Sequence, residues 1–220
     1  MTGFPAFAWV IGSALGAEPK ADPEVDRRVV VAFGAAASWG VGGTAGIWAP
    51  ALAQRLEVTG EVGGRRRTAV GFSLVHARPD LLDSGELIAG APSEAVVGWR
   101  DELSVLFTLR VPLDVGATVP QPDPVLAVLP SFGFGAGVLA TDAHLDVMGF
   151  GSRAGVRSRA LSPVLDARIG AEARFWNWLS LLPHGELLFT VVPDVAEDGS
   201  GEVWDAEARV LVGVDVLVRF

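Results

Sequence analysis

The sequence predicts an all-β protein, an eight-stranded antiparallel up-and-down transmembrane β-barrel. Three observations support this prediction: segments in which apolar residues recur at every second position, tryptophans at segment boundaries, and connections of alternating length. The chain has 220 residues and no cysteine, which allows one domain and excludes disulfides and thiolate chemistry. Its net charge of −9 argues against nucleic-acid binding, which needs a basic surface.

The first residues have the features of an export signal. An apolar run from Phe4 to Ala17 ends in small residues, and charged, proline-containing sequence follows it. This pattern is typical of a secretory signal peptide, although no lysine or arginine precedes the run. We expect a signal peptide over 1–17, with an atypical or incomplete start, a short periplasmic segment over 18–27 and the barrel over 28–220. The alternative for the first segment is a buried N-terminal helix.

Eight segments separate an apolar face from a face of small, polar or charged residues, as a strand with one face in lipid would do. The expected strands cover residues 29–39, 52–62, 69–75, 102–113, 126–138, 165–175, 186–192 and 209–220. Several reach the roughly 9–11 residues that a tilted strand needs to cross a bilayer. Short connections are expected at 63–67 and 176–178, and a moderate one at 114–124. Longer outer loops are expected at 41–49, 78–98, 141–157 and 194–205.

The tryptophans indicate which face contacts lipid. An indole ring with one N–H donor favours the membrane–water interface, where both parts are satisfied. The expected aromatic girdles are Trp39, Trp48, Trp99 and Trp204 at the outer ends, and Phe175, Trp176, Trp178 and Phe220 at the inner ends. The apolar face then contacts lipid and the charged face lines the interior. The alternative is the reverse orientation, a soluble periplasmic β-barrel that binds a small ligand.

With these strands assigned, the chain resembles the small eight-stranded outer-membrane barrels of the OmpA-type and OmpW-type group, over about residues 28–220. The resemblance implies a porin-like barrel in the outer membrane of a Gram-negative-type cell, reached by export through the inner membrane. It also implies that the assembly machinery of that group reads the last strand. The matching positions here are Gly213, Val216, Val218 and Phe220. Tyrosine is absent, and Gly213 lies farther from Phe220 than is usual in the group.

The interior of an eight-stranded barrel is just wide enough for its own side chains. We expect a polar network there, paired because unpaired charge away from water is costly. Its expected members are Arg55, Glu57, Glu61, Glu102, Arg110, Asp166, Arg168, Glu172, Arg174, Arg209, Asp215 and Arg219. A narrow conduit stays open as an alternative, because Gly133, Gly135 and Gly137 could leave a void on one side.

The expected function is a structural or surface-display role, and the alternative is a narrow channel for small or hydrophobic solutes. No enzyme is expected. A further interpretation is a hydrolase at the outer rim, which would use His144 between Asp142 and Asp146 as a base or a metal ligand. His76 and His184 are expected at the membrane interfaces. No cofactor or metal is expected, and the expected partners are outer-membrane lipid and the barrel-assembly machinery, with a monomer favoured.

Overall fold

The computed structural model describes residues 28–41, 48–62, 68–82, 96–113, 127–149, 152–176, 178–195 and 202–220. The expected signal peptide over 1–17 and the expected segment over 18–27 lie outside the described residues. In the ranges just given, no helix is long and apolar enough to cross a membrane.

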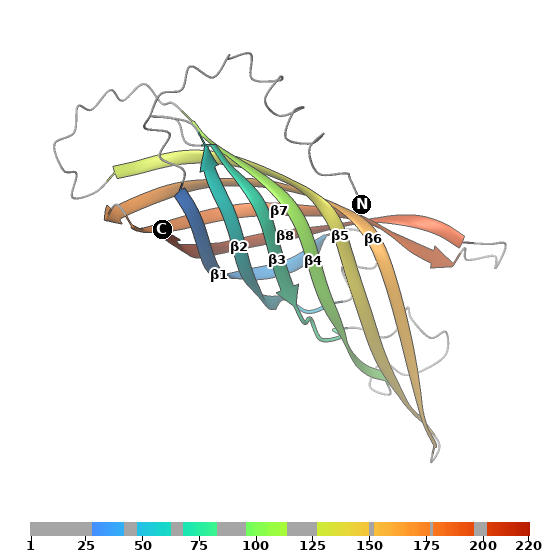
Figure 1. Cartoon of the computed structure of the whole chain (residues 1–220). Coiled ribbons are helices and arrows are strands. Elements are labelled where there is room, and N and C mark those ends of the chain that lie inside the picture. The colour runs from blue at the N-terminus through green and yellow to red at the C-terminus, as the bar shows by residue number, and fades with distance from the viewer. Residues whose placement is uncertain are drawn as a thin grey trace, which may run out of the picture.

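The strands form a closed antiparallel barrel in which each strand pairs with its neighbours in the chain and β1 pairs with β8 (Figure 1). The strands are β1 Arg28–Val41, β2 Ala51–Val62, β3 Thr68–Ala77, β4 Val96–Pro112, β5 Ala127–Gly149, β6 Ser152–Trp176, β7 Leu179–Val195 and β8 Glu202–Arg219. Two backbone hydrogen bonds between Val29 and Phe220 join the ends of the described barrel. The predicted fold class, an eight-stranded antiparallel up-and-down barrel, is confirmed.

The apolar residues face outward and the charged residues face inward. Phe72 is 63% exposed and Phe33 is 55% exposed on the outer wall, whereas Glu57 and Arg168 are buried inside. A continuous exposed belt of phenylalanine, leucine and valine around a closed barrel is typical of a transmembrane barrel. Exposing an apolar surface of this extent to water is unfavourable, and soluble proteins rarely do so. The alternative of a soluble barrel, with the charged face in solvent, is therefore wrong.

The prediction of an outer loop over 141–157 is wrong, because strand structure continues through most of these residues. β5 runs to Gly149 and β6 begins at Ser152, and these two residues pair with each other. Beyond the apolar belt both faces of a strand meet water, so the alternation of apolar and polar residues ends while the hydrogen-bonded ladder does not. The loop expected at 194–205 is shorter for the same reason, since β7 extends to Val195 and β8 begins at Glu202.

The wall of the barrel forks at its outer end, between β6 and β7. The two strands pair only as far as Val164 and Thr190. Above that point β6 pairs with β5 and β7 pairs with β8, so two hairpins diverge, as Figure 1 shows. The Thr190 hydroxyl donates a hydrogen bond to the Pro163 carbonyl oxygen at 2.8 Å and ties the two strands together at the fork.

Candidate functional site

The structure places the twelve predicted network residues inside the barrel. Eleven of them are buried and Arg174 is partly buried. Along β8 the inward positions from the inner end to the outer end are Arg219, Leu217, Asp215, Gly213, Leu211 and Arg209, so charged side chains recur at three levels. The interior therefore consists of three ionic clusters separated by two apolar layers.

The inner cluster consists of Glu61, Glu172, Arg174 and Arg219. The Arg219 guanidinium donates to Glu61 Oε1 at 3.0 Å through Nε and to Glu172 Oε1 at 2.6 Å through Nη2. Glu172 also accepts a hydrogen bond from Arg174 and one from the Ser180 hydroxyl at 2.8 Å. Two guanidinium groups thus face two carboxylates, and the cluster is neutral. An apolar layer of four side chains lies above it: Val30, Ala32, Leu182 and Leu217.

The middle cluster is the largest, and Arg168 is its centre. Its members are Arg55, Glu57, Arg110, Asp166, Arg168, His184, Glu186 and Asp215. Arg168 Nη1 donates to Glu57 Oε2 at 2.9 Å, and Arg55 forms an ion pair with Glu186. The cluster holds three guanidinium groups and four carboxylates, so its carboxylates outnumber its guanidinium groups by one. The His184 ring lies between two of these carboxylates, with ring nitrogens 3.6 Å from Asp215 and 3.8 Å from Glu186.

The outer cluster consists of Arg100, Glu102, Glu207 and Arg209. Arg100 donates to Glu102 at 2.6 Å through Nε and to Glu207 at 3.1 Å through Nη2, and Arg209 lies 2.6 Å from Glu102. A second apolar layer separates this cluster from the middle one: Ala36, Ala53, Val75, Ala77, Leu106, Leu139, Val164, Leu188 and Leu211. Two cations again balance two carboxylates.

Trp48 packs against the outer cluster instead of facing lipid. Its side chain is only 6% exposed, and the Arg100 guanidinium lies 5.0 Å from the centre of its ring, a cation–π contact. The Trp48 backbone forms an antiparallel bridge with Leu81. The prediction that Trp48 lies in the membrane interface is therefore wrong, because its ring is buried against an arginine of the barrel interior.

The glycine-rich face of β5 does not leave the void that the sequence allowed. Side chains of β6 lie over it: a Cβ atom built on Gly135 would stand 3.0 Å from the Asp166 Cβ, and one on Gly133 would stand 3.4 Å from the Arg168 Cβ. The small residues thus make room for the middle cluster. A cavity of about 20 Å³ lies between the second apolar layer and the outer cluster, space for about one water molecule.

The remaining predicted girdle residues lie at the two ends of the barrel wall. At the inner end Phe175, Trp176, Trp178 and Phe220 are all exposed. At the outer end Trp39 is exposed, and Trp99 faces outward and stacks on His144 with ring centres 4.9 Å apart. Trp204 pairs with Pro193 through its backbone, and its side chain lies outside the described part of the structure. Contact of these rings with a membrane interface stays a prediction.

The four residues of the predicted assembly signal do not share one face. Val216 and Phe220 are exposed on the outer wall, with Val218 between them on the same face. Gly213 lies on the inner face, where its backbone is close to Ala36. Recognition of these positions by assembly machinery stays a prediction.

Sequence reasoning left four members of the clusters out of the predicted network: Arg100, His184, Glu186 and Glu207. The alternation itself could have identified them. Arg100 has the parity of Glu102, Glu207 that of Arg209, and His184 that of Glu186. The expectation that His184 lies at a membrane interface is wrong, because its side chain is buried in the middle cluster.

The outer rim holds a second group of charged side chains, on the outward face of β5 and β6. Asp142 Oδ1 accepts a hydrogen bond from Arg157 Nε at 2.8 Å, and Asp142 Oδ2 accepts one from Arg159 Nε at 3.1 Å. Hydrogen bonds from Arg157 and Arg159 hold the pKa of Asp142 well below its usual range. His144 Nε2 lies 3.2 Å from Asp142 Oδ1. Both carboxylate oxygens are thus bound to arginine, so Asp142 serves as the centre of an ion-pair group.

Comparisons with known proteins give a structural likeness and no match in sequence. No protein-family model and no curated protein sequence matches the chain. A major outer membrane protein from Thermus thermophilus matches with a TM-score of 0.51 and 14% identity, over 88% of this chain and 99% of that one. The chain has the fold of the small outer-membrane barrels.

Two further solved structures are similar at lower scores. Neisserial surface protein A covers 88% of this chain and 97% of its own at 12% identity and a TM-score of 0.46. AlkL, an outer membrane protein studied in lipid bilayers, covers 93% of this chain and 95% of its own at 13% identity and a TM-score of 0.47.

Proposed function

We propose that the protein is an outer-membrane barrel with a structural or surface-display role, and that it does not conduct solutes. The observation that carries this proposal is the filled interior. Three ionic clusters and two apolar layers succeed one another along the axis, and Trp48 packs on Arg100 of the outermost cluster. A solute would have to separate buried guanidinium–carboxylate pairs at three levels, which costs several kcal/mol for each charge left unpaired.

The long β5–β6 hairpin supports the surface-display part of the proposal. It continues beyond the last pairing with β7 and carries charged side chains outward, among them Arg157 and Arg159. A wall anchored in lipid by its apolar belt would hold this hairpin at a fixed height above the membrane. Outer-membrane lipid and the barrel-assembly machinery are the partners that such a role requires.

Single-channel recording in planar bilayers tests this proposal. The purified barrel should insert without discrete conductance steps, while a known general porin in the same bilayers gives steps. Insertion is checked separately by heat-modifiable migration on a gel, where the folded and heated forms run differently. Regular conductance steps from the folded protein would favour the alternative function, a narrow channel for small or hydrophobic solutes.

A further inference from the structure

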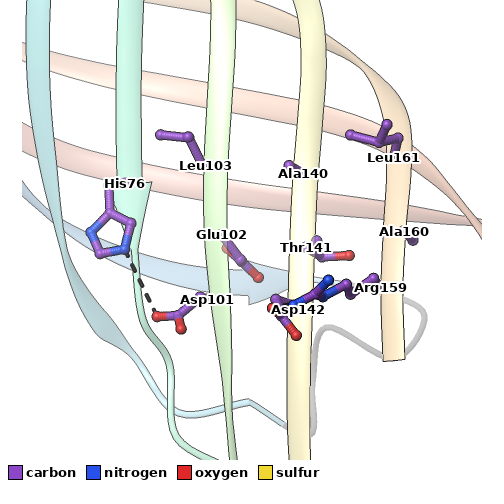
Figure 2. A pocket seen from close by; sticks show the side chains of 10 residues that line it. All are labelled: His76, Asp101, Glu102, Leu103, Ala140, Thr141, Asp142, Arg159, Ala160 and Leu161. Carbon is purple, nitrogen blue, oxygen red and sulfur yellow. Dashed lines mark hydrogen bonds and ion pairs between the residues drawn. The ribbon is translucent and has the colours of Figure 1, made fainter. Parts of the chain in front are cut away.

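A hollow of about 570 Å³ lies on the outer wall of the barrel, across β3 to β6 near the outer rim (Figure 2). Its floor is the small side chain of Ala140, and its apolar walls are Leu103 on β4 and Leu161 on β6. These three residues form one row across the sheet, because Ala140 pairs with both leucines. Leu161 is 72% exposed, so the hollow opens directly toward the lipid side of the wall.

A row of charged residues lies immediately above the apolar row. Asp101 pairs with Asp142 and Asp142 pairs with Arg159, one alternation farther from the membrane than the leucines. His76 lies beside the hollow with its Nε2 3.9 Å from Asp101 (Figure 2). The hollow therefore crosses the boundary between the apolar belt and the polar rim, with aliphatic side chains on one side and ionised groups on the other.

The two aspartates of the hollow, Asp101 and Asp142, are paired with three arginines, so these five groups together carry a net charge of +1. Asp142 holds two guanidinium groups, Arg157 and Arg159, so this trio carries a net charge of +1. Asp101 lies 3.7 Å from the Arg78 guanidinium, which offsets its charge. The Arg159 side chain is 66% exposed, and a guanidinium presents its N–H groups in the geometry that suits phosphate oxygens.

We propose that this hollow binds one membrane lipid with an anionic phosphate headgroup, with the phosphate at Arg159 and an acyl chain over Ala140 between Leu103 and Leu161. The proposal rests on the lipid-facing orientation of the wall and is independent of whether the barrel conducts. A small residue between two large ones gives an acyl chain a defined groove, and the guanidinium directly above fixes the height of the headgroup. By contrast, Ala136, at mid-belt on the same face of β5, has apolar rows on either side of it.

Native mass spectrometry of the full-length protein in detergent micelles tests the proposal. The probes are phosphatidic acid and the diacylglycerol with the same acyl chains, which differ only in the phosphate. The wild-type barrel should retain one phosphatidic acid and little diacylglycerol. Arg159→Gln should lower the retention of phosphatidic acid roughly tenfold, the loss expected for one charge-assisted hydrogen-bonded contact, and Arg159→Lys should restore part of it.

A matched pair of variants tests the groove. Ala140→Leu fills the floor of the hollow and should release the lipid, while Ala136→Leu makes the same change on the same face of β5 at mid-belt and should not. Heat-modifiable migration confirms that each variant is folded, so a failed barrel is distinguished from a failed site. Equal retention of the two lipids, equal effects of the two leucine variants, or displacement of the lipid by inorganic phosphate at equal concentration would each overturn the proposal.

Discussion

Arg168 meets more opposite charge than any other side chain of the described interior for which ion pairs are resolved. Its guanidinium lies 2.9 Å from Glu57, 3.5 Å from Glu186, and 3.7 Å from both Asp166 and Asp215. Such a group cannot be removed alone, because its partners stay buried and charged. Replacing a single member of the middle cluster therefore leaves the remaining charges buried without a complete set of partners.

Arg168→Met should lower the free energy of unfolding by about 3–5 kcal/mol, since it leaves two guanidinium groups among four buried carboxylates. Urea unfolding of the barrel in phospholipid vesicles measures the change. Arg78→Met is the matched control, because its ion pair with Asp101 lies at the exposed rim, where water screens the charges, and should contribute far less. Equal unfolding curves for the two variants would contradict the account of the middle cluster.

Trp48 and Trp176 should respond differently to lipid. Trp48 is buried over Arg100, whereas Trp176 is 57% exposed at the inner end of the wall. Brominated lipids quench tryptophans that they can contact, so Trp176→Phe should reduce the quenched fraction of the fluorescence and Trp48→Phe should raise it slightly. A loss of quenchable signal in Trp48→Phe would place that ring in the membrane after all.

At the scale of the element, alternation predicted the faces of the strands well and their outer ends poorly. In β6 every inward residue from Asp166 to Glu172 follows from the period of two. The same rule failed to extend β5 and β6 to their tip, because its signal is the contrast between lipid and interior, and that contrast ends at the membrane edge. The buried position of Trp48 depends on a bridge between distant segments, which no local pattern encodes.

The outer part of the β5–β6 hairpin should loosen only in strong acid. The pKa of Asp142 lies below its usual value of about 3.9, so its ion pairs contribute stability above that pH and lose it as the pH falls through the lowered pKa. Amide exchange in the hairpin, corrected for intrinsic rates, should be equally protected at neutral pH and at about pH 5 and should weaken below about pH 4. Asp142→Asn should weaken protection at neutral pH and remove this dependence. Loosening of the wild-type hairpin near pH 6 would contradict the proposed role of the Asp142 ion pairs.

A substitution at Phe220, next to the end of β8, distinguishes an effect on assembly in cells from an effect on folding. Phe220 pairs with Val29 through its backbone, and its ring is 76% exposed. Phe220→Ala keeps the backbone pairing, so the purified variant should still refold in detergent. In cells its membrane-inserted fraction should fall severalfold if assembly machinery reads the ring, which heat-modifiable migration of membrane extracts measures. Normal insertion in cells would count against recognition of Phe220.

At the scale of the whole molecule, the interior is packed by charge as much as by apolar contact. The inner and outer clusters pair equal numbers of guanidinium and carboxylate groups, and the middle cluster holds one more carboxylate than guanidinium groups. Buried ion pairs of this kind contribute little net stability compared with apolar packing. They raise the free energy of any strand pairing that leaves their charges without partners. A one-residue slip in the register of a strand would move its charged side chains from the interior to the lipid-facing side. The clusters therefore help to specify the register of the barrel.

The fork between β6 and β7 divides the outer rim into two arms that can vary independently. Since the seam stops at Val164 and Thr190, the two arms above it share no ladder bonds. A change in length or sequence in one arm leaves the pairing of the other intact, and the anchored cylinder below need not adapt. The rim can thus diversify as two separate modules under selection, while the part within the lipid stays constant.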